Sequence, residues 1–404
     1  MSLGSDTREL DSLIKELSVL AKGPLAKARV MPRQVYLSEE LLAREEERIF
    51  HQEWLCAGRV DDIPEAGDFI TYQIGRQPIV VVRLSNQSIH AMANVCRHRM
   101  MRLVEGRGNA KRFACPYHGW TYRIDGRLIG APHMGCTAGF DKKRFTLPAI
   151  RCETWQGWIY VTLSPEAKPI ADRLRALESV VTKYRMEHYV GVFSEDREWN
   201  TNWKLLCENF MEGYHLPVAH RSTVGNDFPV GKTIFDSRGA FDGFTYQCFS
   251  KPDDQLVGIA HPRNRKLRGD WRRTSVMPTV FPSHMYVLAP DHLWYLSVQP
   301  KGPDKVSIRY GVALAPEVLA HHPDVKSFID EIRELLGRVQ EEDRVLVEAI
   351  FKGAQAPLTR RGPLCWLERE IHELYSTWRD NWRNEMISFC YLLFDYRDRI
   401  NARS

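Results

Sequence analysis

The sequence predicts an α+β protein in which an all-β domain is followed by a larger domain of mixed strands and helices. From about Glu53 to Thr162, short β-rich runs alternate with turns rich in Gly, Pro, Asn and Asp. After Ser164-Pro165-Glu166 the pattern changes to longer helical segments and strand-like runs. The chain of 404 residues is long enough for two domains that each have a core.

The composition is typical of a globular protein and argues against several classes of function. The net charge of +5 is modest and gives no reason to expect nucleic acid or a membrane as a partner. No apolar run reaches transmembrane length, and residues 1–22 lack the apolar core of a signal peptide. Nine cysteines in such a chain favour free thiols over a disulfide framework. We therefore expect a cytoplasmic protein.

The first 165 residues divide into a helical N-terminal segment, residues 1–47, and a β domain, residues 48–165. Apolar residues recur at helical spacing in residues 6–22, and a second helical pattern covers residues 38–52, with Ser38 as its N-cap. We expect the N-terminal segment to pack on the second domain. Strands are predicted at residues 69–74, 79–83, 89–92, 149–154 and 158–162, with a hairpin turn at Asp125-Gly126.

Two short motifs inside the β domain predict a metal cluster. They are Cys96-Arg97-His98 and Cys115-Pro116-Tyr117-His118, separated by sixteen residues and followed by Gly119-Trp120. Each motif offers one thiolate and one imidazole. A Rieske-type 2Fe–2S cluster needs two Cys on one iron and two His on the other, so Cys96, His98, Cys115 and His118 are the expected ligands. A Cys2His2 zinc site is the main alternative, although zinc fingers pair Cys with Cys and His with His. The other alternative is that these four are unrelated core residues without a common ligand.

The second domain is expected to cover residues 166–404 and to hold a second metal site. Helices are predicted at residues 169–185, 202–214 and 324–352, and strands at residues 243–249, 284–289, 292–298 and 305–315.

His215 and His220 lie five residues apart, a spacing that does not share one face of a regular helix. Pro217 is expected to break the helix, so that His215 ends it and His220 lies on the following turn. Mononuclear non-haem iron enzymes use two His and one carboxylate and leave positions open. The alternative is that both are ordinary core histidines.

Asp343 is the predicted carboxylate ligand, because it falls inside an apolar stripe of the long helix. A buried carboxylate is costly unless it is paired or binds a metal. Glu342 is predicted at the edge of the stripe, and Glu341, Arg344 and Glu348 are predicted to face away. The stripe consists of Phe328, Ile332, Leu336, Val339, Leu346 and Ile350. A surface position for Asp343 is the alternative.

Together these motifs make the chain similar to the oxygenase (alpha) subunit of Rieske non-haem iron oxygenases, over roughly residues 40–375. Asn202-Trp203-Lys204 and the segment from Glu208 to His220 add to the resemblance. The resemblance implies a Rieske domain, a helix-grip catalytic domain of antiparallel sheet wrapped on helices, and a ring-shaped homotrimer. It also implies that the cluster of one subunit reduces the mononuclear Fe(II) of its neighbour through a bridging acid.

Glu212 departs from the commonest pattern of that family, in which Asp stands three residues before the first His. Glu at this position resembles the branch that oxidises quaternary amines such as carnitine and glycine betaine. We expect Glu212 to bridge His118 of the partner subunit and His215, because a metal-bound imidazole keeps one free N–H. The alternative is a solvated helix residue.

The expected function is that of a terminal oxygenase that hydroxylates or N-dealkylates a small substrate with O2. No strand is followed by G-x-G-x-x-G, so electrons should come from a separate NAD(P)H-dependent reductase. Aromatic residues at 285–296 could form a cage for a trimethylammonium group, but alternation does not tell whether Trp294 or Tyr295 faces the pocket. Ring hydroxylation of an aromatic acid is the alternative reaction. A pure electron carrier and a zinc-stabilised binding protein are the alternative classes.

Overall fold

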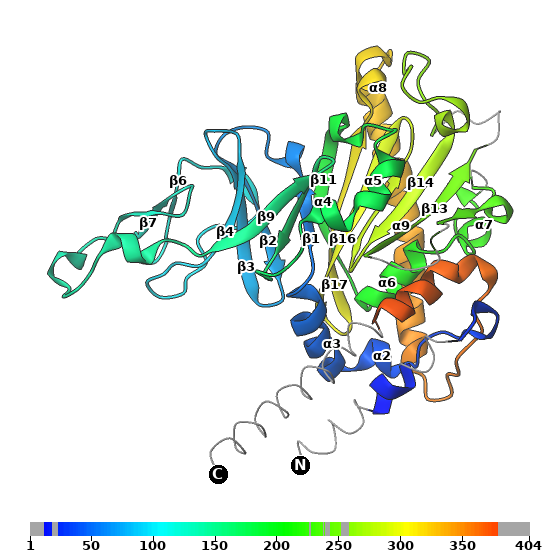
Figure 1. Cartoon of the computed structure of the whole chain (residues 1–404), viewed down its shortest axis with the longest axis horizontal. Helices are drawn as coiled ribbons and strands as arrows, with labels where there is room; N and C mark the ends of the chain where they lie inside the picture. Colours follow the sequence, from blue (N-terminus) through cyan, green and yellow to red (C-terminus); the bar gives the residue numbers. More distant parts are fainter. Residues whose placement is uncertain are drawn as a thin grey trace, which may run out of the picture.

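Two large antiparallel sheets lie side by side in the computed structural model of the chain, and a small third sheet forms its far end (Figure 1). The structure describes residues 12–17, 23–225, 228–236, 238, 243–251 and 258–378. Residues 12–17 are helical. The other residues of the helix predicted at residues 6–22 lie outside the described residues.

The first sheet forms the β domain and has the strand order β1-β10-β9-β4-β3-β2-β5. Four of its seven strands, β2, β3, β9 and β10, closely match the predicted ranges, and β4 extends the predicted strand by one residue. The sequence reading missed β1 and β5. The bounds are β1 Leu55–Arg59, β2 Asp68–Ile74, β3 Gln77–Arg83, β4 Ile89–Ala93, β5 Arg107–Asn109, β9 Ala149–Trp155 and β10 Trp158–Thr162.

The small sheet β6-β7-β8 carries the second cluster motif between β6 and β7, whereas the first motif follows β4 of the first sheet. Its strands are Arg112–Ala114, Thr121–Arg123 and Leu128–Gly130, and the last two form the hairpin predicted at Asp125-Gly126. Cys96 and Cys115 are buried in a hydrophobic cluster that is separate from the main core. Thus the part of the chain that presents the cysteines is packed independently of the second domain.

The second sheet has the order β11-β17-β16-β15-β14-β13-β12, and all its strand pairs are antiparallel. Four strands were predicted, whereas β11, β12 and β14 were not. The bounds are β11 Val190–Trp199, β12 Ile234–Phe235, β13 Phe244–Ser250, β14 Thr274–Val280, β15 His284–Leu288, β16 His292–Gly302 and β17 Lys305–Leu314. The sequence-predicted antiparallel sheet with helices is therefore observed.

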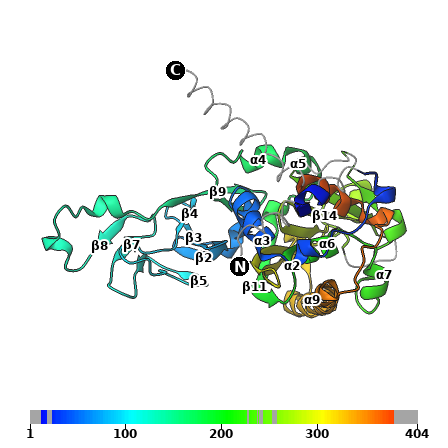
Figure 2. The ribbon, with the colours of Figure 1, turned by 90° about the horizontal axis from the view of Figure 1, so that it is seen from below.

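The helices α6 and α9 lie against the second sheet, whereas α4 and α5 lie on the opposite side of the molecule from α9, next to the β domain (Figure 2). The long α9 packs against α6 and β11, while β1 of the β domain contacts β16. The helices are α2 Gln34–Leu37, α3 Glu39–Glu45, α4 Ile170–Arg173, α5 Arg175–Val181, α6 Trp203–Phe210, α7 Leu216–Ala219, α8 Pro316–His321 and α9 Val325–Gln355.

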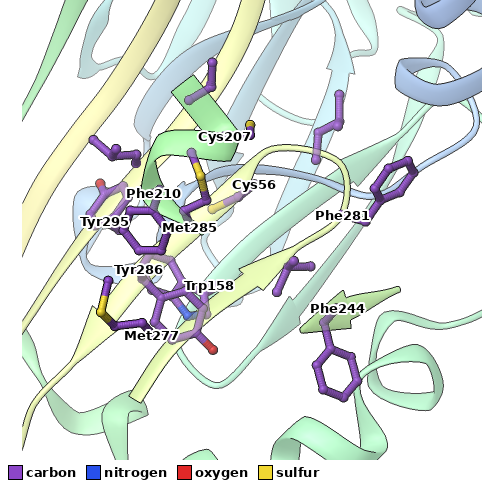
Figure 3. Close-up of a cluster of buried hydrophobic side chains, with 14 of the residues drawn as sticks. Cys56, Trp158, Cys207, Phe210, Phe244, Met277, Phe281, Met285, Tyr286 and Tyr295 are labelled. Carbon is purple, nitrogen blue, oxygen red and sulfur yellow. The ribbon is translucent and has the colours of Figure 1, made fainter. Parts of the chain in front are cut away.

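Aromatic side chains fill the joint between the two domains. Trp158 on β10 has its ring centroid 4.9 Å from that of Tyr295 and 5.3 Å from that of Tyr286, which lie on β16 and β15 (Figure 3). Arg309 on β17 adds hydrogen bonds to the backbone oxygens of Ala57 and Thr71 at 2.7 and 3.1 Å. The largest hydrophobic core therefore runs through both domains without interruption.

The N-terminal segment contacts the catalytic part of the chain. Ser38 caps α3 as predicted, its hydroxyl accepting from the amide of Leu41 at 3.1 Å. Buried Glu45 forms an ion pair of 2.7 Å with buried Lys204 on α6. Arg33 donates to the carbonyl of Ala356 at the end of α9 at 2.8 Å. These contacts agree with the predicted packing, while the domain boundaries at residues 47 and 165 stay a prediction.

Three predictions about helices are corrected by the structure. The helix predicted at 202–214 ends at Phe210, where the amide of Met211 donates to the carbonyls of Cys207 and Glu208 and closes α6. Residues 169–185 form two short helices, α4 and α5, instead of one. On α9 the apolar stripe runs through Val347 and Phe351, whereas Leu346 and Ile350 are 37% and 51% exposed.

Candidate metal centres and active site

The two cluster loops have the same backbone design. The amide of Cys96 donates to the carbonyl of Met101, and the amide of Cys115 donates to that of Trp120, both at 2.8 Å. In each loop the residue four after the cysteine has a positive φ, 56° at Met100 and 69° at Gly119. Each cysteine is thereby buried beneath a tight turn, because the chain must fold back over it.

The histidines of these loops lie on the outside. His98 and His118 are exposed, and their ring centroids are 4.7 Å apart. Trp120 stacks on His98 with a centroid distance of 4.9 Å, and the hydroxyl of Tyr122 accepts from the amide of Arg97 at 3.0 Å. The four side chains thus form an inner pair of thiols and an outer pair of imidazoles, as a cluster with two distinct irons requires.

The spacing of these four residues does not suit a single zinc ion. Ligands of one tetrahedral ion would approach to within about 4 Å of one another. Within the described part of the chain, the one group of three or more such ligand atoms that all lie within 4.8 Å is His215, His220 and Asp343. The loops therefore fit a wider two-iron cluster better than they fit zinc.

His215 and His220 flank the short helix α7, which corrects the predicted geometry. His215 is the N-cap residue of α7 and His220 is its C-cap residue. Pro217 does not break this helix, because proline is tolerated in a first turn, where its missing N–H has no helical partner. The single turn places both imidazoles on one site, with ring centroids 5.2 Å apart.

Asp343 on α9 completes this group. Its Oδ1 lies 3.1 Å from Nε2 of His220 and 3.7 Å from Nε2 of His215. The same oxygen is buried and has no hydrogen-bond donor. An unpaired buried carboxylate oxygen that faces two imidazole nitrogens fits a metal ion, which would satisfy all three atoms at once.

A second carboxylate stands behind each imidazole. Oε1 of Glu212 lies 2.5 Å from Nδ1 of His215, and Oε2 of Glu342 lies 2.7 Å from Nδ1 of His220. Glu212 is also held by the amides of Tyr214 and His215, so it is part of the turn rather than a solvated helix residue. Both acids therefore face the side of the ring opposite to Asp343.

Two groups of the site, His220 and Glu342, have shifted pKa values. Burial alone would lower the pKa of His220, but the carboxylates of Asp343 and Glu342 outweigh it and raise that pKa. Burial would raise the pKa of Glu342, but hydrogen bonds from Thr223, His220 and Ser222 lower it. A cation is thus favoured between these groups, which is the role of a divalent metal.

Apolar side chains from the sheet close the space next to the triad. A cavity of about 50 Å³ is lined there by Trp294, Met277 and Phe210, among others, and Phe210 meets Trp294 edge-on at 5.7 Å. Trp294 faces this cavity, whereas Tyr295 is buried on the opposite face of β16. Alternation in the sequence did not tell whether Trp294 or Tyr295 faces the pocket. In the structure Tyr295 packs into the joint between the domains, so Trp294 faces the cavity.

A much larger hollow adjoins the site on the other side. Its volume is about 1140 Å³, and it shares Asn209, Glu212 and His215 with the small cavity. Leu346 and Ile350 of α9 form part of its apolar wall. Both residues were predicted to belong to the buried apolar stripe of the helix. In the structure they line the hollow instead, which accounts for their apolar character.

Three residues near the site were missed by sequence reasoning as functional residues. Asn209 has its amide nitrogen 3.5 Å from Nε2 of His215. Glu342 was predicted only as an edge residue of the stripe, and Ser222 donates to it at 2.7 Å. Glu348 was predicted to face away, yet its Oε1 accepts from the amide of Asn200 at 3.0 Å. The contacts of Glu342 and Glu348 have no local sequence signal, because they join segments far apart in the chain, whereas Asn209 lies only six residues before His215.

Comparison with protein families agrees with both metal centres. Residues 53–145 match the family described as "Rieske [2Fe-2S] domain", and residues 182–384 match "Ring hydroxylating alpha subunit (catalytic domain)". The second match covers just over half of the chain, so the chain belongs to the ring-hydroxylating alpha-subunit family of Rieske non-haem iron oxygenases. The predicted resemblance and fold class are confirmed, and the two domains imply a Rieske 2Fe–2S cluster and a mononuclear iron.

Individual relatives are subunits of quaternary-amine monooxygenases. The oxygenase subunit of glycine betaine monooxygenase from Pseudomonas aeruginosa is 38% identical over 247 residues, which are 59% of this chain and 57% of that protein. Choline monooxygenase, chloroplastic, from Arabidopsis thaliana is 28% identical over 392 residues, 91% of this chain and 86% of that protein. The chain thus spans little more than half of the bacterial relative in this match.

A solved structure supports the fold. A quaternary ammonium Rieske monooxygenase superposes with a TM-score of 0.78 at 21% identity, covering 90% of this chain and 98% of that chain. Among the described residues of the present chain, no helix is both long and apolar enough to cross a membrane.

Proposed function

We propose that the chain is the terminal oxygenase of a Rieske monooxygenase that oxidises a small quaternary ammonium compound. The observation that carries the proposal is the buried, unpaired Oδ1 of Asp343 between the Nε2 atoms of His215 and His220. These three residues would hold the mononuclear iron. Bound there, iron supplies the activation of O2 for insertion of one oxygen atom into a C–H bond.

The balance of the reaction defines what the protein must provide. One oxygen atom of O2 enters the substrate C–H bond as a hydroxyl group, and the other leaves as water. Two electrons and two protons are taken up in each turnover. Hydroxylation of a carbon next to the nitrogen leads to C–N cleavage, so N-dealkylation is the expected outcome. The apolar wall of Met277, Phe210 and Trp294 would exclude bulk water from this step.

The charges around the small cavity favour a cationic substrate. Its lining combines the aromatic rings of Phe210, Phe228 and Trp294 with the carboxylates of Glu212 and Asp343. A trimethylammonium group is attracted both to aromatic faces and to carboxylates. No Lys or Arg of the described chain lines this cavity, so the carboxylate of an aromatic acid would have no partner in it. The similarity to glycine betaine and choline monooxygenases supports the same substrate class.

A homotrimer with electron transfer between subunits is part of the proposal. The cluster loops and α7 lie at opposite ends of the chain (Figures 1 and 2), so the iron of the same chain is remote from the cluster. The large hollow beside Glu212, with its exposed Leu346 and Ile350, offers a place for the exposed His118 of the partner subunit. Glu212 would then bridge the two imidazoles. Electrons would enter from a separate NAD(P)H-dependent reductase.

Oxygen consumption with a substrate panel tests the proposal. The holoenzyme with a matching reductase is given choline, glycine betaine, carnitine and a set of aromatic acids. We expect O2 uptake that depends on a quaternary ammonium compound, with aldehyde formed in proportion to the O2 used. Uptake and hydroxylated product with aromatic acids alone would contradict the substrate class. A protein that is reduced and reoxidised without substrate-dependent O2 uptake would instead be an electron carrier.

A further inference from the structure

Glu342 lies behind the His220 ring, as Glu212 lies behind the His215 ring. It follows Glu341 and precedes Asp343 on α9, yet it does not face the space between the two Nε2 atoms. Its Oε2 lies 2.7 Å from Nδ1 of His220, on the far side of that ring from Oδ1 of Asp343, which is 3.1 Å from Nε2. The geometry excludes Glu342 and Asp343 from exchanging roles, because one imidazole separates them.

Three donors converge on the Glu342 carboxylate. Besides the His220 ring, the hydroxyl of Ser222 donates to Oε1 at 2.7 Å and the hydroxyl of Thr223 donates to Oε2 at 2.6 Å. The Glu342 side chain is 22% exposed, and no Lys or Arg of the described chain forms an ion pair with it. Its charge is therefore compensated by these donors, all of which come from the segment that carries His220.

The carboxylate thus couples two elements that are far apart in the sequence. It ties the turn after α7 to the rigid 31-residue helix α9, which also carries Asp343. A ring that donates Nδ1–H to a carboxylate has its Nε2 lone pair free and aimed away, and the negative charge makes that nitrogen a stronger ligand. His220 itself is only 1% exposed, so the bond is shielded from competing water.

We infer that Glu342 is a positioning residue that holds the His220 imidazole through Nδ1 and directs its Nε2 to the mononuclear metal. The inference deepens the proposed function, since it concerns the same metal site, but it does not depend on the substrate. Glu342 touches neither substrate nor metal. It acts through His220, as Glu212 acts through His215, so that each imidazole of the triad has its own carboxylate.

Metal retention without substrate tests the inference. Trimeric protein with intact cluster is dialysed against rising concentrations of an Fe(II) chelator, and iron is counted against acid-labile sulfide, which reports the cluster. We expect Glu342→Ala to release the mononuclear iron at a chelator concentration at least about tenfold lower than the wild type. Glu342→Gln, which keeps the shape and removes the charge, should shift it by several-fold. Glu341→Gln, a matched change on the same helix whose acid pairs with Arg344, should leave it unchanged.

A second pair of changes separates ring positioning from loop closure. Ser222→Ala and Thr223→Val together remove both hydroxyl bonds to Glu342 but leave its contact with His220. If Glu342 acts through His220, this double variant retains iron better than Glu342→Ala. The inference is overturned if Glu342→Gln and Glu342→Ala retain iron like Glu341→Gln, or if the double variant alone reproduces the loss. Should Glu342→Ala fail to fold, Glu342→Gln decides. A failed substrate screen leaves this outcome untouched.

Discussion

At the scale of the residue, the acids of this chain differ by what surrounds them. Asp343, Glu212 and Glu342 each lie next to an imidazole of the metal site. Glu208, one turn before Glu212, is buried and accepts from the hydroxyl of Tyr36, which lies 3.0 Å from both its oxygens. Burial raises the pKa of Glu208, whereas hydrogen bonds lower the pKa of Glu342, so the two acids differ through their surroundings.

Glu208 should make the stability of the protein fall as pH rises through neutrality. Burial raises the pKa of Glu208 from 4.5 to about 8, so the folded state keeps a proton that the unfolded state has lost. The stabilisation is fully present below about pH 4.5 and is lost as pH rises through about 8. Between these values the free energy of unfolding should fall by about 1.4 kcal/mol per pH unit from this group. Glu208→Gln should lack this slope, as measured by urea unfolding at several pH values.

The control for this prediction is a change that keeps Glu208 in place. Glu341→Gln alters an exposed acid of α9 and should leave the pH slope as in the wild type. Equal slopes for Glu208→Gln and the wild type between pH 5 and 8 would mean that Glu208 is ionised in the folded protein.

Asp343→Ala should remove the mononuclear iron and turnover while leaving the cluster intact. The reason is that the buried Oδ1 is the single carboxylate oxygen facing both Nε2 atoms. Iron content should fall from about three per chain to about two, with an unchanged visible spectrum and EPR signal of the cluster. If Asp343→Ala keeps its iron and activity, the triad is assigned wrongly and another carboxylate supplies the third ligand.

At the scale of the element, α9 has two faces with different tasks. Buried Ile332, Leu336, Val347 and Phe351 hold the helix against the catalytic domain. Leu346 and Ile350 instead line the large hollow beside the active site. Ile332, Leu336 and Val339 are buried at spacings of four and three, Val347 and Phe351 at a spacing of four, and Asp343 lies midway between Val339 and Val347, four residues from each. The helix therefore fixes the metal ligand through its packed face and leaves apolar residues free on the other.

A matched pair of substitutions on α9 checks this division. Val347 is fully buried and Val345 is 53% exposed. Changing either to Ala alters helix propensity equally, so the difference between them reports packing. Val347→Ala should lower the free energy of unfolding by about 2 kcal/mol, from lost burial and the cavity left behind. Val345→Ala should stay within about 0.5 kcal/mol. Urea unfolding followed by tryptophan fluorescence measures both, and equal losses would mean that Val347 does not lie on the packed face of α9.

At the scale of the whole molecule, one chain places its two metal centres at opposite ends. The cluster loops are packed on a core of their own, and the triad is packed against the helices of the second domain. Between them lies the continuous joint of Trp158, Tyr286 and Tyr295 (Figure 3). This joint fixes the angle between the domains, and with it the direction in which the cluster loops point.

Glu212→Gln tests whether a second chain receives electrons through the acid. An ionised carboxylate accepts a hydrogen bond from each of two metal-bound imidazoles, whereas an amide presents its NH2 end to one ring N–H. Both metal sites should remain filled and the trimer should persist. Oxidation of the pre-reduced cluster, with substrate and O2, should slow by at least about tenfold, or ~1.4 kcal/mol on the barrier. Stopped-flow absorbance measures this rate.

The wild-type rate in Glu212→Gln would remove Glu212 from the electron path. Glu212→Asp provides the graded control, because it keeps the charge and shortens the side chain. It should recover part of the rate if the subunit interface can close by about one methylene. Glu341→Gln, which lies outside the site, should reoxidise as the wild type does.

Local sequence was sufficient for the features that depend on short spacing. The motifs at Cys96 and Cys115 predicted the inner thiols and outer imidazoles, because a cluster loop is a single tight turn. Ser38 predicted the start of α3, and alternation predicted most strands of both sheets. His215, His220 and Asp343 were predicted from residue type and helix pattern, and the structure brings the three side chains together. In each case the physical cause lies within a few residues of the pattern.

Tertiary structure decided what depends on contacts between distant segments. Leu346 and Ile350 were assigned to the wrong face of α9. Apolar residues at spacings of three and four fit more than one helix face, and only the packing partner shows which face is buried. Tyr295 turns to the domain joint, so that Trp294 is left to line the cavity. Glu342 reaches His220 across 122 positions of sequence, and no pattern in either segment encodes that meeting. Only the folded structure brings Glu342 and His220 together, because a hydrogen bond depends on the distance in space between two groups and not on their separation in the sequence.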